Sequence, residues 1–181
     1  MKTLREPVFG GTPDSAVRLR LDPAFETVFL GAVRLARALA ADLSGTSQDG
    51  AGTASLTGTG GSIALVLAAS VRTPLPGLAN SNGFFPGLAG VVKTLADEHE
   101  PSGIRINGLL PVRIATDRVR QLDALSGDPD EVRTRLSQTI PLRRYGEPAE
   151  FGRAAAFLLS PAASCIAGAM IPVDGGAIRS I

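Results

Sequence analysis

Three short apolar runs, separated from one another by helix-forming sequence, constrain the fold of this 181-residue chain more than any other feature. The runs are Ile63–Ala69 (IALVLAA), Ile104–Leu110 (IRINGLL) and Ala169–Val173 (AMIPV). Continuous apolar runs of strand length are typical of strands that helices cover on both faces. The alternation therefore predicts an α/β fold with a parallel sheet.

Helix signals lie before, between and after these runs. Asp22 and Pro23 form an N-cap acceptor followed by proline, and apolar residues then recur at helical spacing as far as Leu43. The broad apolar face of this helix indicates packing on two sides. Further helices are expected over about 86–99, over Asp117–Leu125, from Asp128, and from Pro148, the last burying Phe151, Ala155 and Leu158.

Residues 45–61 form a segment rich in glycine, serine and threonine. These three residue types occupy twelve of its seventeen positions. A phosphate-binding loop must follow a strand and open a helix, so that the helix N–H groups point at the phosphate. This segment follows a helix and precedes a strand, which is the wrong order. We expect a flexible surface insertion within a single domain spanning residues 1–181.

Composition and charge exclude several classes of function. The formal net charge is +1 and no basic cluster is longer than Arg143–Arg144, so neither a nucleic-acid interface nor a membrane-surface patch is indicated. One cysteine and one histidine allow neither an intramolecular disulfide nor a soft-ligand metal cluster. With no signal peptide and no apolar run long enough to span a bilayer, we expect a cytoplasmic protein that binds no nucleic acid, membrane or metal.

Residues 140–176, IPLRRYGEPAEFGRAAAFLLSPAASCIAGAMIPVDGG, closely resemble the C-terminal segment of short-chain dehydrogenases/reductases. Residues 61–71 are similar to the fifth strand of that family, and residues 103–111 to the sixth. Upstream, VFGGTP, which contains Gly10 and Gly11, resembles a distant form of the cofactor-facing turn after the fourth strand. The resemblance implies a Rossmann-like parallel sheet with covering helices, N-terminally truncated to strands four to seven, in a family that binds NAD or NADP.

The family transfers a hydride between nicotinamide and a carbonyl or alcohol carbon, using a Ser, a Tyr and a Lys four residues after the Tyr. The resemblance places Ser70 at the serine position. One alignment puts Ser81 at the tyrosine position and Phe85 at the lysine position, whereas the other puts Gly83 and Gly87 there. Neither alignment supplies a phenol or an ammonium group, so the family's proton chemistry is expected to be impaired.

The resemblance also implies cofactor contacts in the loop PVRIAT, namely Pro111, Ile114 and Thr116, which would face the nicotinamide carboxamide. Val112 replaces the usual glycine of this loop, and the alternative interpretation of Thr116 is a turn leading into the next helix. Ser70 has a similar alternative, as a capping hydroxyl at a strand end.

Four further residues are interpreted as structural. Tyr145, the only tyrosine, lies where the family carries a packing residue. Asn107 is expected to form local hydrogen bonds, and His99 to lie at a helix C-terminus, where a partly positive imidazole suits the helix dipole. Cys165 lies in an apolar stretch and is expected to pack in the core.

Three functions stay open at this point. The chain is a weakly active or unusual NAD(P)-linked oxidoreductase, or a non-catalytic subunit, or the truncated product of a full-length gene. For the subunit, the resemblance implies that helices over 23–43 and 82–99 pair across a two-fold axis with a second copy or with a full-length relative. A strip of small residues, Gly83, Gly87 and Gly90, would let another helix approach closely. The sequence indicates neither a substrate nor a choice between NAD and NADP.

Overall fold

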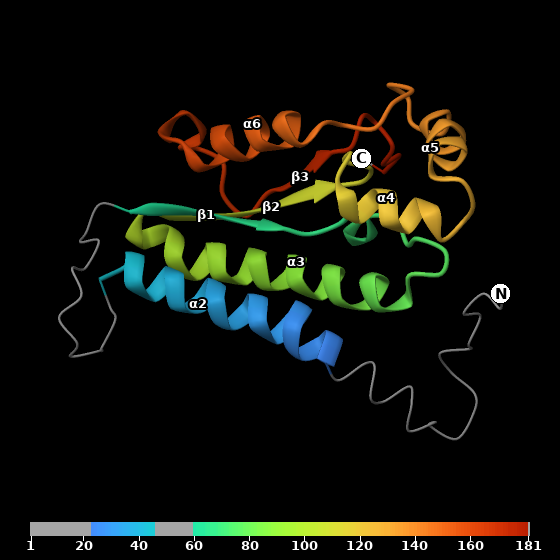
Figure 1. Cartoon of the computed structure of the whole chain (residues 1–181). Helices are drawn as coiled ribbons and strands as arrows, with labels where there is room; N and C mark the ends of the chain where they lie inside the picture. Colours follow the sequence, from blue (N-terminus) through green and yellow to red (C-terminus); the bar gives the residue numbers. More distant parts are fainter. Residues whose placement is uncertain (1–22, 46–59, 181) are drawn as a thin grey trace, which may run out of the picture.

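A computed structural model describes residues 23–45 and 60–180, and its centre is a three-stranded parallel sheet (Figure 1). The strands are β1 (Gly61–Val66), β2 (Ile104–Pro111) and β3 (Met170–Val173), in the order β1-β2-β3. Ile63 lies opposite Ile106, and Leu109 lies opposite Ile171. The predicted parallel α/β sheet is confirmed.

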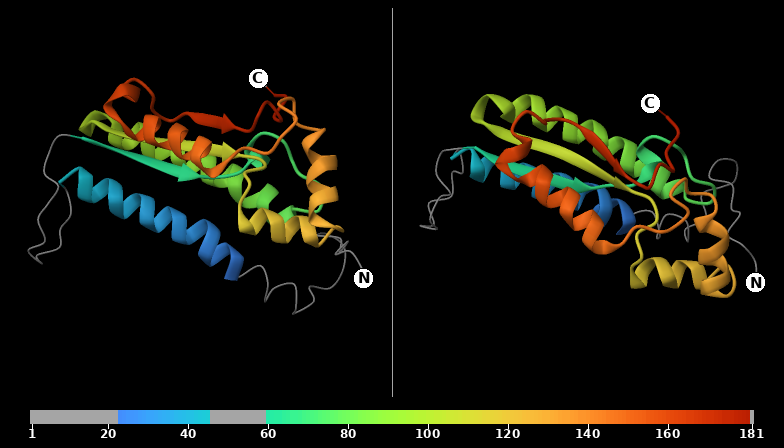
Figure 2. Two further views of the ribbon diagram at one scale, coloured as in Figure 1. Left: turned by 45° about the horizontal axis from the view of Figure 1, so that its top comes forward. Right: turned by 90° about the horizontal axis from the view of Figure 1, so that it is seen from above.

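Helices form a layer on each face of the sheet (Figures 1 and 2). A π-helical turn, η1 (Phe25–Leu30), leads into α2 (Gly31–Leu43), which shares one face with α3 (Ala79–His99), while α6 (Pro148–Leu159) covers the other. Two shorter helices, α4 (Asp117–Ala124) and α5 (Pro129–Ser137), lie beyond the carboxyl ends of the strands. Short 3-10 turns complete the described chain: η2 (Ala69–Val71), η3 (Glu100–Ser102) and η4 (Pro161–Ala163).

Two boundaries differ from the sequence-based expectation. β1 spans Gly61–Val66 instead of Ile63–Ala69, because the chain turns at Ala69 into η2. Helix α3 begins at Ala79, so Pro86 lies inside the helix and not at its start. The Asn82 side chain explains the early start, since its amide oxygen accepts from Leu75 N and its amide nitrogen donates to Leu75 O, both at 2.9 Å.

The hydrophobic core lies on both faces of the sheet. On the face of α2 and α3, small residues of α2 let the helix approach β1 closely, and Leu43 lies against Gly61, 2.8 Å from where a Cβ would be. The expected burial of Leu158 against the other face, with Phe151 and Ala155 packed around it, is confirmed. The buried cluster on the first face comprises Ala36, Ala40, Ile63, Val92, Leu95, Ala96, Ile104 and Ile106.

Arg105 fixes the end of α6 against the sheet. Its guanidinium donates to three backbone carbonyls, Leu158 O at 3.0 Å, Ser160 O at 3.1 Å and Ile166 O at 3.2 Å. A cation suits this position because the last carbonyls of a helix have no partner within the helix and carry its partial negative charge. Arg105 therefore ties β2 to the helix above it.

The outer edge of β1 is open within the described chain, since β1 pairs there with β2 alone. Val66 at this edge is 59% exposed. On the face of α2, a groove of about 400 Å³ runs beside the strand and is lined by apolar residues of α2, β1 and α3. In residues 23–45 and 60–180, no helix combines the length and the apolar character that crossing a membrane requires.

Candidate functional site

The candidate site lies at the carboxyl edge of the sheet, where ligands of open parallel α/β sheets bind. The segments that follow the three strands meet there: η2 with Ser70 after β1, the loop to Thr116 after β2, and Asp174 after β3. Gly10 and Gly11, the remaining predicted cofactor contacts, and most of the predicted insertion at 45–61, lie outside the described residues.

Ser70 and Ser81 lie next to each other in the structure, but the hydroxyl of Ser70 forms a hydrogen bond with the protein backbone. Ser70 is 3% exposed, and its Oγ donates to the backbone carbonyl of Ser81 at 3.1 Å. Ser81 lies in the first turn of α3, and Phe85 packs into an apolar cluster with Leu67 and Leu88. Residues 79–86 carry no ionisable side chain, so no phenol or ammonium group faces Ser70 from this part of α3.

The alternative alignment brings no catalytic group either. Gly83 faces open space, and the ring of Phe29 covers Gly87, 2.9 Å from where a Cβ would be. The contact at Gly87 agrees with the expectation that small residues on α3 allow close helix approach.

The loop that follows β2 is held by its own backbone bonds. Pro111 ends β2 opposite Val173, and Ile114 forms a parallel bridge with Gly146. The carbonyl of Ile114 accepts from Thr116 N at 2.8 Å. Thr116 caps α4, with its hydroxyl accepting from Val119 N at 3.3 Å, which confirms the turn into a helix.

Two small cavities flank this loop. One of about 130 Å³ includes Ile114, Arg144 and Asp174 in its lining, and one of about 170 Å³ is lined in part by Thr116 and Tyr145. Ligand sites usually measure about 300–1,000 Å³, so these residues would contact only part of a dinucleotide. In the described ranges, every buried side-chain nitrogen and oxygen has a hydrogen-bond partner, so no orphaned polar group marks a cofactor contact.

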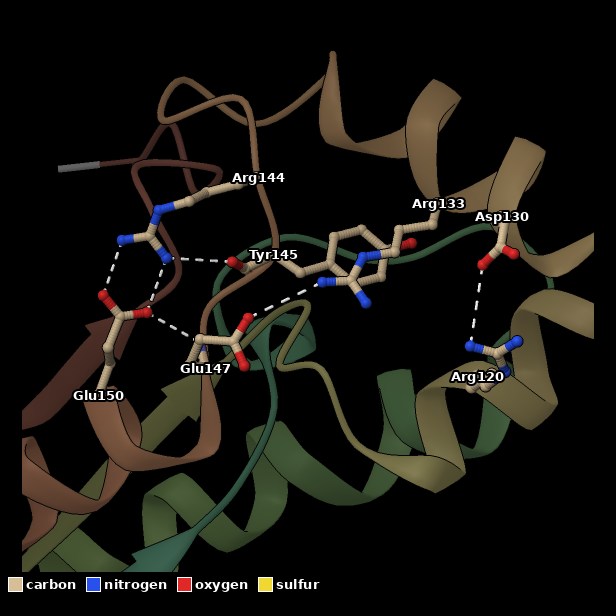
Figure 3. Close-up of polar contacts among 7 residues, drawn as sticks. All are labelled: Arg120, Asp130, Arg133, Arg144, Tyr145, Glu147 and Glu150. Carbon is tan, nitrogen blue, oxygen red and sulfur yellow. Dashed lines mark hydrogen bonds and ion pairs between the residues drawn. The ribbon is translucent and has the colours of Figure 1, made fainter.

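A charged network lies at the start of α6 (Figure 3), and its members Arg144 and Glu150 line the cavity of about 130 Å³. Arg144 makes two 2.7 Å contacts with the carboxylate of Glu150, which also accepts from Glu147 N at 2.8 Å. The hydrogen bond from Arg144, followed by the bond from the Glu147 backbone, lowers the pKa of Glu150 from 4.5 to about 2. The same pairing raises the pKa of Arg144, so the ion pair holds the first turn of α6 while Glu150 is charged.

Tyr145 is buried, as a packing residue should be, but its hydroxyl has a specific partner. The ring is 2% exposed, and the hydroxyl donates to Asp123 Oδ2 at 3.0 Å. Burial, and then the hydrogen bond to Asp123, raise the pKa of Tyr145. Sequence reasoning missed Asp123, because nothing in the pattern of α4 distinguishes this carboxylate from the exposed acids around it.

Three of the remaining predictions are resolved by the contacts. His99 ends α3 as expected, with Nδ1 3.3 Å from Ser44 Oγ. The expectation that Asn107 forms local hydrogen bonds was wrong. The residue is fully buried and bonds to a distant segment: it donates to Ile166 O and accepts from Ala169 N, each at 2.9 Å. The packing role of Cys165 was also wrong, because this residue lies exposed after η4. No three metal-ligating side chains gather anywhere in the part of the chain that the structure describes.

Several known proteins with similar sequences and structures are named as oxidoreductases, dehydrogenases or reductases. The model of the family described as enoyl-(acyl carrier protein) reductase matches residues 30–177. Oxidoreductase UcpA of Salmonella typhimurium is 38% identical over 91 residues, which cover 49% of this chain and 35% of that protein.

Two solved structures have a similar fold. A putative short-chain alcohol dehydrogenase from Sinorhizobium meliloti is 28% identical with a TM-score of 0.74, over 93% of this chain and 59% of the other. An NADPH-bound short chain oxidoreductase with an atypical catalytic center, from Pseudomonas aeruginosa PAO1, is 30% identical with a TM-score of 0.60, over 66% of this chain and 47% of the other. The chain thus spans about a third of the curated relative, about three fifths of the first solved chain and about half of the second.

Proposed function

Since the chain belongs to the short-chain dehydrogenase/reductase family, we propose that it is an NAD(P)-linked oxidoreductase by descent whose catalysis is weak or absent. The hydrogen bond from Ser70 Oγ to the carbonyl of Ser81 carries this proposal. This bond occupies the proton of Ser70, the residue that matches the family's catalytic serine. Phe85, which stands at the lysine position, lies in an apolar cluster.

In this arrangement no side chain of the described residues takes the place of the general acid that exchanges a proton with the substrate in the family. A phenol titrates near 10 and an adjacent ammonium can lower its pKa further, whereas a serine hydroxyl does not titrate near neutrality. A positioned general acid contributes about 10²–10⁴-fold in rate. We therefore expect any turnover to be slower than that of intact relatives by at least this factor.

The cofactor of the family supplies the hydride when it is bound. In this chain, Ile114 and Thr116 would lie beside the carboxamide of the cofactor. The two small cavities at this loop have room for only this part of the cofactor. We propose NAD or NADP as the cofactor class, without a preference between them.

The test is an assay of the purified chain with NADH and NADPH against a panel of ketones and the corresponding alcohols. We expect no turnover above the background without protein, and no change in Ser81→Ala. Robust turnover that Ser81→Ala abolishes would contradict the proposal.

A second candidate function is that of a non-catalytic subunit that associates through α2 and α3. The shape of the outer surface of these helices favours it. A groove of about 520 Å³ runs there, lined by residues that include Gly87, Gly90 and Arg37. A Cβ added at Gly90 would meet nothing within 4 Å. Small residues on a helix surface permit another helix to approach closely, which supports a second copy or a full-length relative as the partner.

Size-exclusion chromatography with light scattering tests this candidate. We expect a dimer for the wild-type chain and a monomer for Gly90→Leu, because the added side chain would occupy the surface of close approach. Gly152→Leu is the matched control: a Cβ there also meets nothing within 4 Å, but Gly152 lies on α6, on the other face of the sheet. A monomeric wild-type chain, or equal effects of both substitutions, would contradict association with a second copy through this surface.

A further inference from the structure

A buried carboxylate at the carboxyl edge joins three segments that are distant in the sequence. Asp123, at the end of α4, contacts Arg113 Nη1 through Oδ1 at 2.7 Å and accepts from the Tyr145 hydroxyl through Oδ2 at 3.0 Å. Its side chain is 4% exposed. A buried carboxylate needs its charge paired and its oxygens hydrogen-bonded, and here the two partners satisfy one oxygen each. We call Arg113, Asp123 and Tyr145 the Tyr145 cluster.

The ring of Tyr145 is held as firmly as its hydroxyl. The guanidinium carbon of Arg113 lies 5.8 Å from the ring centroid. That of Arg133, on α5, lies 5.2 Å from the centroid, and Figure 3 shows this side chain over the ring. Arg133 also lies 3.8 Å from the carboxylate of Glu147. Cations this close to an aromatic face are attracted to it. The ring therefore has a fixed orientation even without its hydroxyl, which makes that hydroxyl a separable contact.

The backbone next to Tyr145 pairs with the loop that follows β2. Gly146 N donates to Arg113 O, and Ala115 N donates to Gly146 O, both at 2.8 Å. The loop is thus held twice: by these backbone bonds, and by the Arg113 side chain through Asp123. Only the second connection depends on the phenol.

We propose that the Tyr145 hydroxyl is a positioning group, which through Asp123 and Arg113 fixes the loop from Arg113 to Thr116 relative to α4. Replacing Tyr145 with Phe leaves the ring between its guanidinium groups but removes one of the two partners of the buried carboxylate. That this loop faces the nicotinamide rests on the proposed function, whereas the coupling among the three side chains does not.

Hydrogen–deuterium exchange of the full 181-residue chain tests the proposal without any ligand. In Tyr145→Phe, we expect amides of residues 112–124 to exchange at least about tenfold faster, the change that loss of one hydrogen bond to a charged group produces in local opening. Amides of α2 and α3 should be unchanged. Asp97→Asn is the control, since it removes an exposed carboxylate paired with Lys93 on α3 and should leave residues 112–124 unaffected. No change, or an equal increase over the whole chain, would overturn the proposal.

The absorbance of the phenolate gives a second readout, because the chain has one tyrosine and no tryptophan. Asp123 raises the pKa of Tyr145 by accepting its hydrogen bond and by its charge, whereas Arg113 lowers it. In the near-isosteric variant Asp123→Asn, we expect Tyr145 to titrate at a lower pH than in the wild type. An unchanged titration would show that the hydroxyl is not coupled to Asp123 and would overturn the positioning role. Failure of NADPH to bind the wild-type chain would bear on the proposed function alone.

Discussion

Two hydroxyl groups at the carboxyl edge of the sheet already donate hydrogen bonds to acceptors within the protein. Ser70 donates to a backbone carbonyl and Tyr145 to a buried carboxylate. Glu150 is the acid whose pKa the structure changes most clearly, and its pairing with Arg144 has a consequence that can be measured by its pH dependence.

Glu150→Gln should reduce stability at neutral pH and not at low pH. The pKa of Glu150 is lowered from 4.5 to about 2, so the carboxylate stabilises the folded chain fully above pH 4.5, and this contribution is lost as the pH falls toward 2. The difference between the free energies of unfolding of the wild type and Glu150→Gln should therefore shrink over this range. Urea unfolding at several pH values measures it.

The matched control is Glu98→Gln, which changes an exposed glutamate on α3 that forms no ion pair with any described residue. Its effect on the free energy of unfolding should be small. A difference between wild type and Glu150→Gln that stays constant down to pH 2 would show that Arg144 does not stabilise the carboxylate.

At the scale of elements, sequence patterns predicted what depends on periodicity and missed what depends on side-chain contacts. The strands, and the helix that begins at Pro148, follow from apolar runs and local capping signals. The start of α3 at Ala79 does not, because it is set by the bonds between Asn82 and the Leu75 backbone. Likewise, the position of Ser70 after a parallel strand was predictable. The contact between Tyr145 and Asp123 was not, because it joins the end of α4 to a loop 22 residues further along the chain.

The docking of α6 provides a prediction at this scale. Arg105→Met should lower the free energy of unfolding by about 1.5–3 kcal/mol, the usual contribution of hydrogen bonds to a charged group, because the carbonyls at the end of α6 lose their donor. Chemical denaturation measures the loss. Arg118→Met, on the exposed surface of α4, is the control and should change stability by less than about 0.5 kcal/mol. Equal effects of the two substitutions would contradict the capping role of Arg105.

For the molecule as a whole, the open edge of β1 is the main liability. An edge strand with unpaired backbone groups and exposed apolar side chains is a template for association, and natural proteins often protect such edges with lysine. Both faces beside this edge carry apolar surface, since Val66 and, on α6, Phe157 are more than half exposed.

Val66→Lys should therefore slow aggregation of the concentrated chain, while changing the free energy of unfolding by less than about 0.5 kcal/mol, as is usual for surface substitutions. Static light scattering over time measures the aggregation. Leu125→Lys, at an exposed apolar position at the end of α4, is the comparison. An equal benefit from both substitutions would attribute the effect to net charge and not to the edge of β1.

The contacts of Leu43 with Gly61 and of Ser44 with His99 place the end of α2 beside the start of β1. The six residues of β1 separate this end of the sheet from Ser70 by about 20 Å, at about 3.3 Å per residue. A reporter domain spliced between Gly45 and Gly60 would thus enter and leave the fold at neighbouring points, remote from the Tyr145 cluster. This junction offers a place to label the protein for imaging or surface attachment while the carboxyl edge of the sheet stays untouched.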